Sequence, residues 1–202
     1  VIKPGVRMIS AASCSINALA PVMQILDRNF GIDHAFMTSV HAYTNDQRLA
    51  DVPGKDLRRS RAAAENIIPT DTYSPLAIGT IVPELEGKLT GIALNVPVPD
   101  GSCVDLTCRM ERKVTREEVN EVLRSAAASK YKSIIEYSED PLVSSDVIGN
   151  SHSAIVDGLA TMVMDGDLAK TVIWYDNGWG YATRVVELMI RLRDLTEPQT
   201  AQ

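Results

Sequence analysis

A cysteine and a histidine offer the clearest chemistry in this sequence. Cys14 stands in the run Ser-Cys-Ser-Ile-Asn over residues 13–17, directly ahead of residues with helical spacing. Backbone N–H groups at the start of a helix favour a negative charge, so the pKa of a thiol there is expected to be lowered. His41 comes at the end of a predicted strand, and a thiolate beside an imidazole is nucleophilic at neutral pH. The ordinary alternative is a buried structural cysteine with an unrelated histidine.

The segment that follows Cys14 is predicted to be a helix over residues 17–30. Gly31 offers a C-terminal cap for this helix. Pro21 lies inside the pattern and is tolerated only if the helix starts late, because a proline in mid-helix costs about 3 kcal/mol. The apolar residues with helical spacing are Leu19, Val22, Met23, Leu26 and Phe30.

His41 belongs to a predicted strand over residues 35–42. Phe36, Thr38 and Val40 alternate along it and therefore share one face. The polar stretch 44–61 follows, with several arginines and a Pro-Gly pair. Connections of more than about 12–15 residues are usually functional or disordered, so this stretch is predicted to have a function.

The second half of the chain is predicted to contain two hairpins and two helices. The hairpins are 89–98 with 103–110 around Pro99-Asp100-Gly101-Ser102, and 159–164 with 169–175 around Asp165-Gly166. Thr115 and Glu118 form a capping box that opens a helix. The helices bury Val119, Val122, Leu123 and Ala126 in one case, and Val185, Leu188, Met189, Leu192 and Leu195 in the other.

These elements together predict an α+β fold, with a mixed, largely antiparallel sheet and helices on one face. No predicted strand leads into a Gly-x-Gly-x-x-Gly turn. That turn is the fingerprint of a dinucleotide-binding unit, so such a unit is expected to be absent from this chain.

Composition limits the function further. The 202 residues are 45% hydrophobic and 23% charged, with a net charge of −6, which is ordinary for a globular protein and gives no general attraction to nucleic acid or to anionic membranes. No apolar run approaches the roughly 18–20 residues that cross a bilayer. Three cysteines argue against a disulfide framework and favour a reducing, cytoplasmic setting.

A metal site is the weakest hypothesis. Cys103 and Cys108 lie on a predicted strand, and His34 and His152 have no companions at ligand spacing. Zinc sites need three or four converging ligands, so no metal is expected.

Six ordered segments of the chain resemble the phosphorylating glyceraldehyde-3-phosphate dehydrogenase family. They are 12–17 with 20–21, 39–47, 56–59, 62–70, 83–85 with 87–89, and 174–177 with 179–181. The resemblance implies a catalytic domain over residues 1–181, with the family's S-loop at about 44–61, and a C-terminal helix and tail over 182–202. The N-terminal dinucleotide-binding domain is expected to be missing from the chain.

The resemblance also implies the reaction. Cys14 is the nucleophile that adds to an aldehyde carbonyl, and His41 is the base that activates the thiol and accepts the hydroxyl proton as hydride leaves. Inorganic phosphate then attacks the thioacyl enzyme and yields an acyl phosphate. Asn177 and Tyr181 match residues beside the nicotinamide of NAD or NADP; the sequence leaves open which of the two is used.

Seven residues are expected to bind substrate or phosphate. They are Ser13, Ser15, Thr44, Arg61, Thr72, Tyr73 and Asn95. Ser13, Thr72 and Arg61 match the family's site for attacking phosphate, where hydroxyls and a guanidinium suit a small dianion. Thr44 matches the site for the substrate's phosphate. Arg58 and Arg59, which neighbour this set in the sequence, are interpreted as a solvated charge run.

Asn95 is the most informative departure from the family pattern, because an arginine is usual there. The amide removes a full charge and a bidentate donor, and a charge-assisted hydrogen bond contributes about 1.5–3 kcal/mol. The Asn95→Arg variant is therefore predicted to have a lower Michaelis constant for glyceraldehyde 3-phosphate. Tyr73 stands where glycine is usual, Ala18 replaces a second cysteine, and Gly178 replaces a glutamate for no evident reason.

The implied partners are a phosphorylated sugar aldehyde, foremost glyceraldehyde 3-phosphate, inorganic phosphate, and other copies of the chain in a homotetramer. Neither nucleic acid nor a membrane is expected. Erythrose 4-phosphate dehydrogenase is an alternative, which Tyr73 and the segment 151–158 favour. A non-catalytic binding or assembly role is the other, although it needs neither Cys14 nor His41. The isolated chain is expected to lack hydride-transfer activity.

Overall fold

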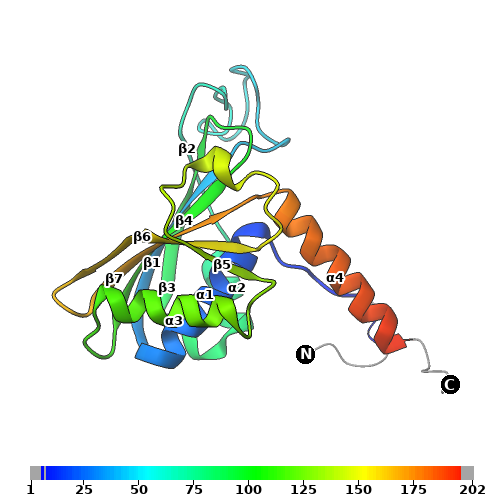
Figure 1. Cartoon of the computed structure of the whole chain (residues 1–202). Helices are drawn as coiled ribbons and strands as arrows, with labels where there is room; N and C mark the ends of the chain where they lie inside the picture. Colours follow the sequence, from blue (N-terminus) through cyan, green and yellow to red (C-terminus); the bar gives the residue numbers. More distant parts are fainter. Residues whose placement is uncertain (1–5, 7, 197–202) are drawn as a thin grey trace.

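The computed structural model describes residues 6 and 8–196, and its centre is one seven-stranded sheet (Figure 1). The strands are β1 (Ile32–Ala42), β2 (Ile68–Thr70), β3 (Leu89–Val96), β4 (Ser102–Met110), β5 (Ile135–Ser138), β6 (Ala154–Met164) and β7 (Leu168–Tyr175). Their order across the sheet is β2-β3-β1-β4-β7-β6-β5. Only β1–β3 and β5–β6 are parallel pairs, so the predicted mixed, largely antiparallel sheet is confirmed.

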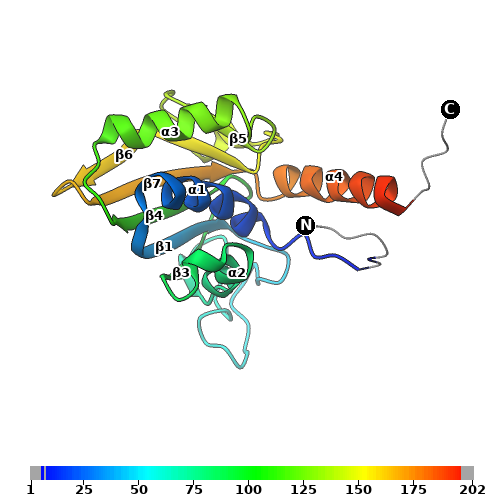
Figure 2. The same cartoon turned by 90° about the horizontal axis from the view of Figure 1, so that it is seen from below.

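Of the four helices in the described residues, three cover one face of this sheet (Figures 1 and 2). The helices are α1 (Cys14–Phe30), α2 (Ser74–Ile81), α3 (Arg116–Ala128) and α4 (Trp179–Thr196), with short 3-10 turns η1 (Pro83–Leu85) and η2 (Ser144–Val147). α1 packs on β4, β6 and β7, while α2 lies on β3 and α3 on β5 and β6. α4 leaves the body at the end of β7 and projects away from it.

The core lies between the sheet and the helices on its covered face. Val104 and Leu106 of β4 are fully buried, in one apolar cluster with Leu19 and Met23 of α1. The other face of the sheet is covered by no helix in the described part of the chain. Phe36 stands on this open face with 66% of its surface exposed.

α1 starts at Cys14, three residues earlier than predicted. The cap is Ser13, whose Oγ accepts a hydrogen bond from the Ile16 N–H at 3.2 Å. Apolar spacing could not mark this start, because the first turn includes the polar residues Ser15 and Asn17. Pro21 therefore does lie inside the helix, contrary to expectation, and it has no N–H to donate to the carbonyl of Asn17.

The first predicted hairpin is wrong. β3 and β4 are antiparallel to each other, but β1 lies between them and pairs with both. The turn around Gly101 therefore passes over the end of β1, where the Tyr43 N–H donates to the Val98 carbonyl at 3.1 Å. Gly101 has φ +82°, and a Cβ there would overlap the Ser144 carbonyl, so only glycine fits this crossing.

The second hairpin and the capping box are confirmed. β6 and β7 pair up to Met164 opposite Leu168, and both Asp165 and Gly166 have positive φ. Thr115 Oγ1 accepts from the Glu118 N–H at 3.1 Å, and Glu118 accepts from the Thr115 N–H at 2.8 Å.

α4 is amphipathic, as predicted, but little of its apolar stripe is covered. Val185, Leu188 and Leu192 are half-buried, whereas Met189 is 64% exposed. The helix is held at its base, where a Cβ on Gly180 would come within 2.7 Å of the His152 carbonyl oxygen. No helix in the described ranges is long and apolar enough to span a bilayer.

Candidate active site

The start of α1 and the end of β1 bring Cys14 and His41 together. The sulfur lies 3.4 Å from Nε2 of the imidazole. Nδ1 of the same ring lies 2.6 Å from the backbone carbonyl of Ala42, which can only accept a hydrogen bond. Nδ1 therefore carries the ring proton, and Nε2 is left as the acceptor for the S–H proton. This is the arrangement that lets an imidazole take a proton from a thiol.

The charge state of Cys14 differs from the sequence-based expectation. Burial raises the pKa of the Cys14 thiol, and hydrogen bonds with Ser15 lower it only in part. The expected lowering by the helix start is thus outweighed by desolvation. The resting sulfur is therefore a thiol that donates to His41, and it becomes a nucleophile only by passing its proton to Nε2.

A buried hydroxyl cluster lies beneath the pair. Tyr175 Oη lies 2.8 Å from Ser15 Oγ and 3.3 Å from Ser39 Oγ. The Tyr175 ring also meets the His41 ring edge-on, with centroids 6.1 Å apart. Burial raises the pKa of Tyr175 well above its usual value, so the hydroxyl stays protonated. The cluster ties α1, β1 and β7 together directly behind the reacting atoms.

A cavity of about 540 Å³ opens in front of His41. Seven of the predicted residues line it, namely Ser13, Ser15, His41, Thr44, Thr72, Tyr73 and Asn95. Cys14 is not part of the wall, but both of its chain neighbours are, and its sulfur contacts the lining His41. Arg61, Asn177 and Tyr181 lie outside the wall.

The arginine that lines the cavity is Arg59, not Arg61. Arg59 is hydrogen-bonded through its guanidinium to the carboxylate of Asp46. Arg61 instead lies with its Nε 3.4 Å from Asp51. Asp56 Oδ1 turns the chain here by accepting the Arg59 N–H at 3.1 Å. Aspartates within the same polar stretch are the signal that one of its arginines is held in place by an ion pair, although its side chain stays partly exposed.

The far end of the cavity is built from amides and hydroxyls. Gln47 Oε1 accepts from the Thr44 N–H at 3.0 Å and from Asn95 Nδ2 at 2.8 Å. Asn95 is carried there by β3, where it stands opposite His41 in the parallel pairing. The sequence-based prediction included Thr44 and Asn95 but missed the buried Gln47. The Thr44 hydroxyl also donates to Asp46.

Asn177 lies behind the cavity, at the junction of β7 and α4. Its Oδ1 accepts from Ser102 Oγ at 2.8 Å, and the same Oγ accepts from the Ala42 N–H at 3.0 Å. Asn177 is therefore linked through Ser102 to Ala42, whose carbonyl oxygen orients the His41 ring. Tyr181 is half-buried in the first turn of α4. A Cβ on Gly178 would meet only Asp176 Oδ1, at 3.5 Å, so no close contact explains why this residue is a glycine.

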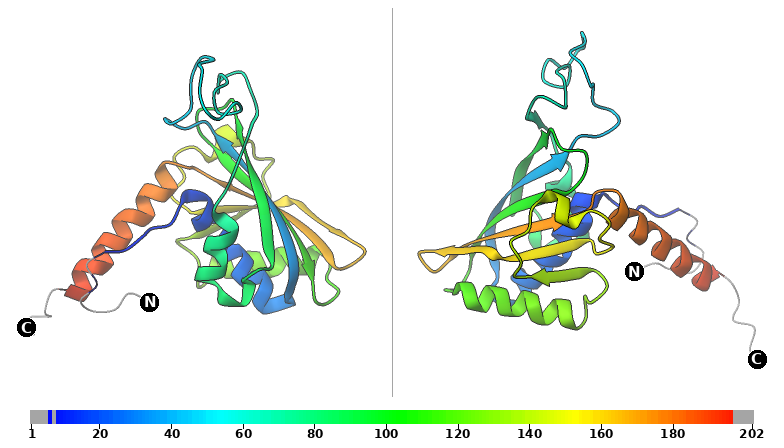
Figure 3. Two further views of the ribbon diagram at one scale, coloured as in Figure 1. Left: turned by 180° about the vertical axis from the view of Figure 1, so that it is seen from behind. Right: turned by 45° about the horizontal axis from the view of Figure 1, so that its top comes forward.

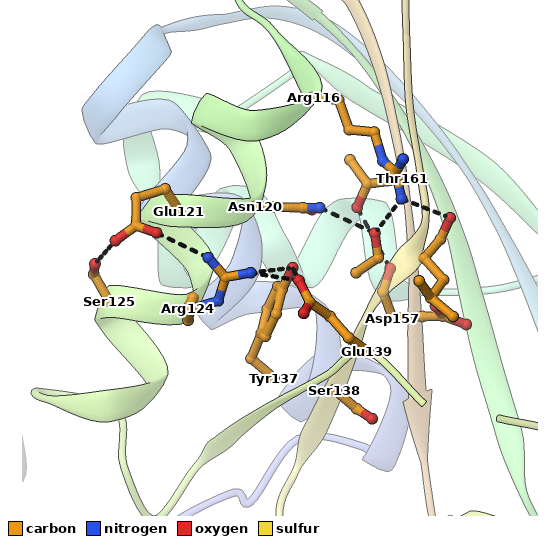
Figure 4. Close-up of polar contacts among 12 residues, drawn as sticks. Arg116, Asn120, Glu121, Arg124, Ser125, Tyr137, Ser138, Glu139, Asp157 and Thr161 are labelled. Atoms are coloured by element: carbon orange, nitrogen blue, oxygen red, sulfur yellow. Dashed lines mark hydrogen bonds and ion pairs between the residues drawn. The ribbon is translucent and has the colours of Figure 1, made fainter. Parts of the chain in front are cut away.

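A second polar cluster lies on α3, β5 and β6 (Figure 4), and none of its labelled residues lines the cavity. Arg124 donates to Glu121 at 2.9 Å, to Tyr137 at 3.3 Å and to Glu139. These side chains bond to one another, which indicates a structural role. Among the described residues, no three or more of His, Cys, Asp and Glu could together hold a metal ion.

Comparison with known proteins points to one family. The family model described as glyceraldehyde 3-phosphate dehydrogenase, C-terminal domain, matches residues 13–177. A glyceraldehyde-3-phosphate dehydrogenase of Borreliella burgdorferi is 54% identical over 193 residues, which is 95% of this chain and 58% of that protein. One of Geobacillus stearothermophilus is 54% identical over 90% of this chain and 54% of its own length. The chain thus spans about half the length of the curated relatives it matches.

Proposed function

Because the chain belongs to the glyceraldehyde-3-phosphate dehydrogenase family, as its C-terminal domain, we propose that it carries out the covalent steps of an aldehyde oxidation. His41 Nε2 takes the proton of Cys14, and the sulfur forms a bond to the carbonyl carbon of a sugar aldehyde. Nε2 returns that proton to the carbonyl oxygen, which gives a hydroxyl-bearing hemithioacetal. The same Nε2, neutral again, later accepts this hydroxyl proton as general base while a hydride leaves the carbon. The substrate proposed first is glyceraldehyde 3-phosphate, the aldehyde in the relatives' printed name.

The thioester that results is released by phosphate. A phosphate oxygen attacks the carbonyl carbon, the C–S bond breaks, and the sulfur takes back its proton from His41. The product is an acyl phosphate. Ser13 and Thr72 offer hydroxyls and Arg59 a guanidinium in one cavity, which suits a small dianion. Arg59 takes the place of Arg61 in this proposal, because Arg61 lies outside that cavity.

A nicotinamide cofactor, NAD or NADP, would supply the hydride acceptor when bound. The fit rests on Asn177, whose Oδ1 is engaged by Ser102 while its Nδ2 has no hydrogen-bond partner within the described ranges. Nδ2 can therefore donate to a carboxamide. Tyr181 would pack near the ring. The rest of the cofactor requires a dinucleotide-binding domain that precedes residues 1–181 in the whole protein.

Assembly into a homotetramer is part of the proposal. The polar stretch 44–61, the proposed S-loop, projects beyond the end of the sheet (Figure 3), and the open face carries Phe36 and Met162, both more than half exposed. Exposed apolar surface of this kind marks contact sites. All three cysteines are free thiols, which fits a reducing, cytoplasmic setting.

The observation that carries the proposal is the 3.4 Å contact between the Cys14 sulfur and Nε2 of an oriented imidazole. The test is alkylation by iodoacetamide at pH 7, followed site by site by mass spectrometry. Cys14 should react much faster than Cys103 and Cys108, and His41→Asn should slow Cys14 by about 100-fold. His34→Asn, an exposed histidine on the same strand, is the control and should change nothing.

A non-catalytic binding role is favoured by one observation, the raised pKa of the Cys14 thiol. It predicts that all three cysteines react slowly and that His41→Asn leaves the rate at Cys14 unchanged. That result would remove the catalytic proposal.

A further inference from the structure

The cavity in front of His41 holds few positive charges. Its wall contains one guanidinium and no ammonium group, since Arg59 is the only arginine and no lysine takes part. Asp46 and Asp71 also line it, so the carboxylates outnumber the permanent cations. The proposed reaction of a phosphorylated aldehyde needs two oxyanions here, one on the substrate and one that attacks.

The single guanidinium is already engaged. Arg59 bonds to Asp46, and Asp46 also accepts the Thr44 hydroxyl. The Thr44 hydrogen bond and the Arg59 charge lower the pKa of Asp46, so this carboxylate is ionised at neutral pH. A dianion placed at Thr44 would meet a fixed negative charge, which disfavours its binding.

The contacts left at the far end are uncharged. Gln47 Oε1 holds both the Thr44 backbone and the Asn95 side chain, which fixes Asn95 at the cavity wall. An amide and a hydroxyl there can exchange hydrogen bonds with an alcohol, which both donates and accepts. They carry no positive charge, so they lack the ion pairing and the bidentate geometry that a guanidinium offers a phosphate.

We infer that this cavity holds one oxyanion, not two, and that Asn95 makes it accept an uncharged, hydroxyl-bearing end of the aldehyde as readily as a phosphorylated end. The inference rests on the proposed function, because it concerns the aldehyde that Cys14 would attack. Asn95 is then a specificity-determining residue, and unphosphorylated short hydroxyaldehydes are the substrate class that it admits.

The test uses the chain as it is, because adduct formation at Cys14 needs no hydride acceptor. D-glyceraldehyde and D-glyceraldehyde 3-phosphate are compared by the concentration of each that halves the rate of Cys14 alkylation. The two concentrations should agree within about threefold. In Asn95→Arg, the value for the phosphorylated aldehyde alone should fall by about tenfold or more, the ratio expected for one charge-assisted contact.

Thr80→Arg is the matched control, since it adds the same charge at an exposed position on α2 outside the cavity and should alter neither value. A wild-type preference of tenfold or more for the phosphorylated aldehyde would overturn the inference and leave the proposed function standing. That comparison needs no variant, so it decides even if Asn95→Arg fails to fold. Protection by neither aldehyde would remove the proposed function itself.

Discussion

The three cysteines carry the same group in three different environments. Cys14 contacts an imidazole, whereas Cys103 and Cys108 lie on β4, where nearby carboxylates disfavour the thiolate. Burial raises the pKa of Cys103 to about 11 and that of Cys108 to about 12. Only Cys14 therefore has a route to the thiolate at neutral pH, and that route passes through His41.

Because the Cys108 thiol is buried, the free energy of unfolding should depend on pH in the alkaline range. Its pKa rises from 9.0 in a free thiol to about 12 in the folded chain. Folding therefore favours the protonated form, and the free energy of unfolding should decline above about pH 9 as the unfolded chain ionises. One such group contributes a slope of about 1.4 kcal/mol per pH unit.

The Cys108→Ala variant should lack that contribution. Urea unfolding at pH 8, 9.5 and 10.5 should show the variant's loss of stability shrinking as the pH rises. Cys14→Ala is the comparison at a site without complete burial. A difference between wild type and Cys108→Ala that is the same at all three pH values would contradict the prediction.

At the residue level, the features that the sequence predicted well are those that depend on residues close by in the chain. His41 stands one residue before the end of β1, where the alternating pattern predicted it, whereas α1 begins at Cys14, three residues earlier than its apolar spacing indicates. The choice between Arg59 and Arg61 depends on which aspartate each arginine meets after the polar stretch has folded back. The pKa of Cys14 depends on how deeply the sulfur is buried, which no local pattern records.

Among the elements, α4 is anchored at its start by one side chain, that of Asp176. The buried carboxylate of Asp176 accepts the N–H groups of Gly178 at 2.8 Å and Trp179 at 2.6 Å through Oδ1. Oδ2 accepts the Gly149 N–H at 2.7 Å. One residue thus joins the end of β7, the first turn of α4 and the loop after η2.

Removing this carboxylate should loosen the base of α4. Asp176→Ala should cost at least about 1.5–3 kcal/mol in the free energy of unfolding, the range for hydrogen bonds to a charged group. Asp176→Asn keeps one acceptor oxygen and should cost less. Asp194→Ala, on the exposed far part of the same helix, is the control. Equal urea midpoints for Asp176→Ala and Asp194→Ala would show that the hydrogen bonds of Asp176 contribute nothing to the free energy of unfolding.

The strand pairing shows what turn residues can and cannot predict. Asp165-Gly166 predicted a reversal and the two strands beside it pair directly. The turn before Ser102 predicted a reversal equally well, yet β1 fills the space between β3 and β4. Turn residues predict that the chain reverses direction. They do not predict which strand pairs with which, because that depends on packing across the whole sheet.

At the scale of the whole molecule, one face of the sheet is covered by no helix among the described residues. Phe36, Met162 and Met164 are each more than half exposed on its strands. Thr107 and Lys170 stand between Phe36 and Met162 in the strand register, so this face mixes apolar and polar residues. We expect the chain to self-associate through this face. Phe36→Asp should shift the mass measured by light scattering toward that of a single chain.

Leu76 provides the control for that measurement, because it is 76% exposed on α2, on the helical side of the sheet. Leu76→Asp should leave the mass unchanged. If both variants behave alike, or if the wild-type chain is already monomeric, this face is not where copies of the chain meet.

The central position of β1 also bears on the order in which the chain folds. Neither strand that pairs with β1 is adjacent to it in the chain, so two long loops must close before it gains a partner. β6 and β7, joined by a short turn, can pair at once. Loop closure costs entropy before contacts repay it, so we expect β1 to dock late in folding. His41 arrives with it, and a chain arrested halfway would possess a hairpin and a helix but no base for its nucleophile.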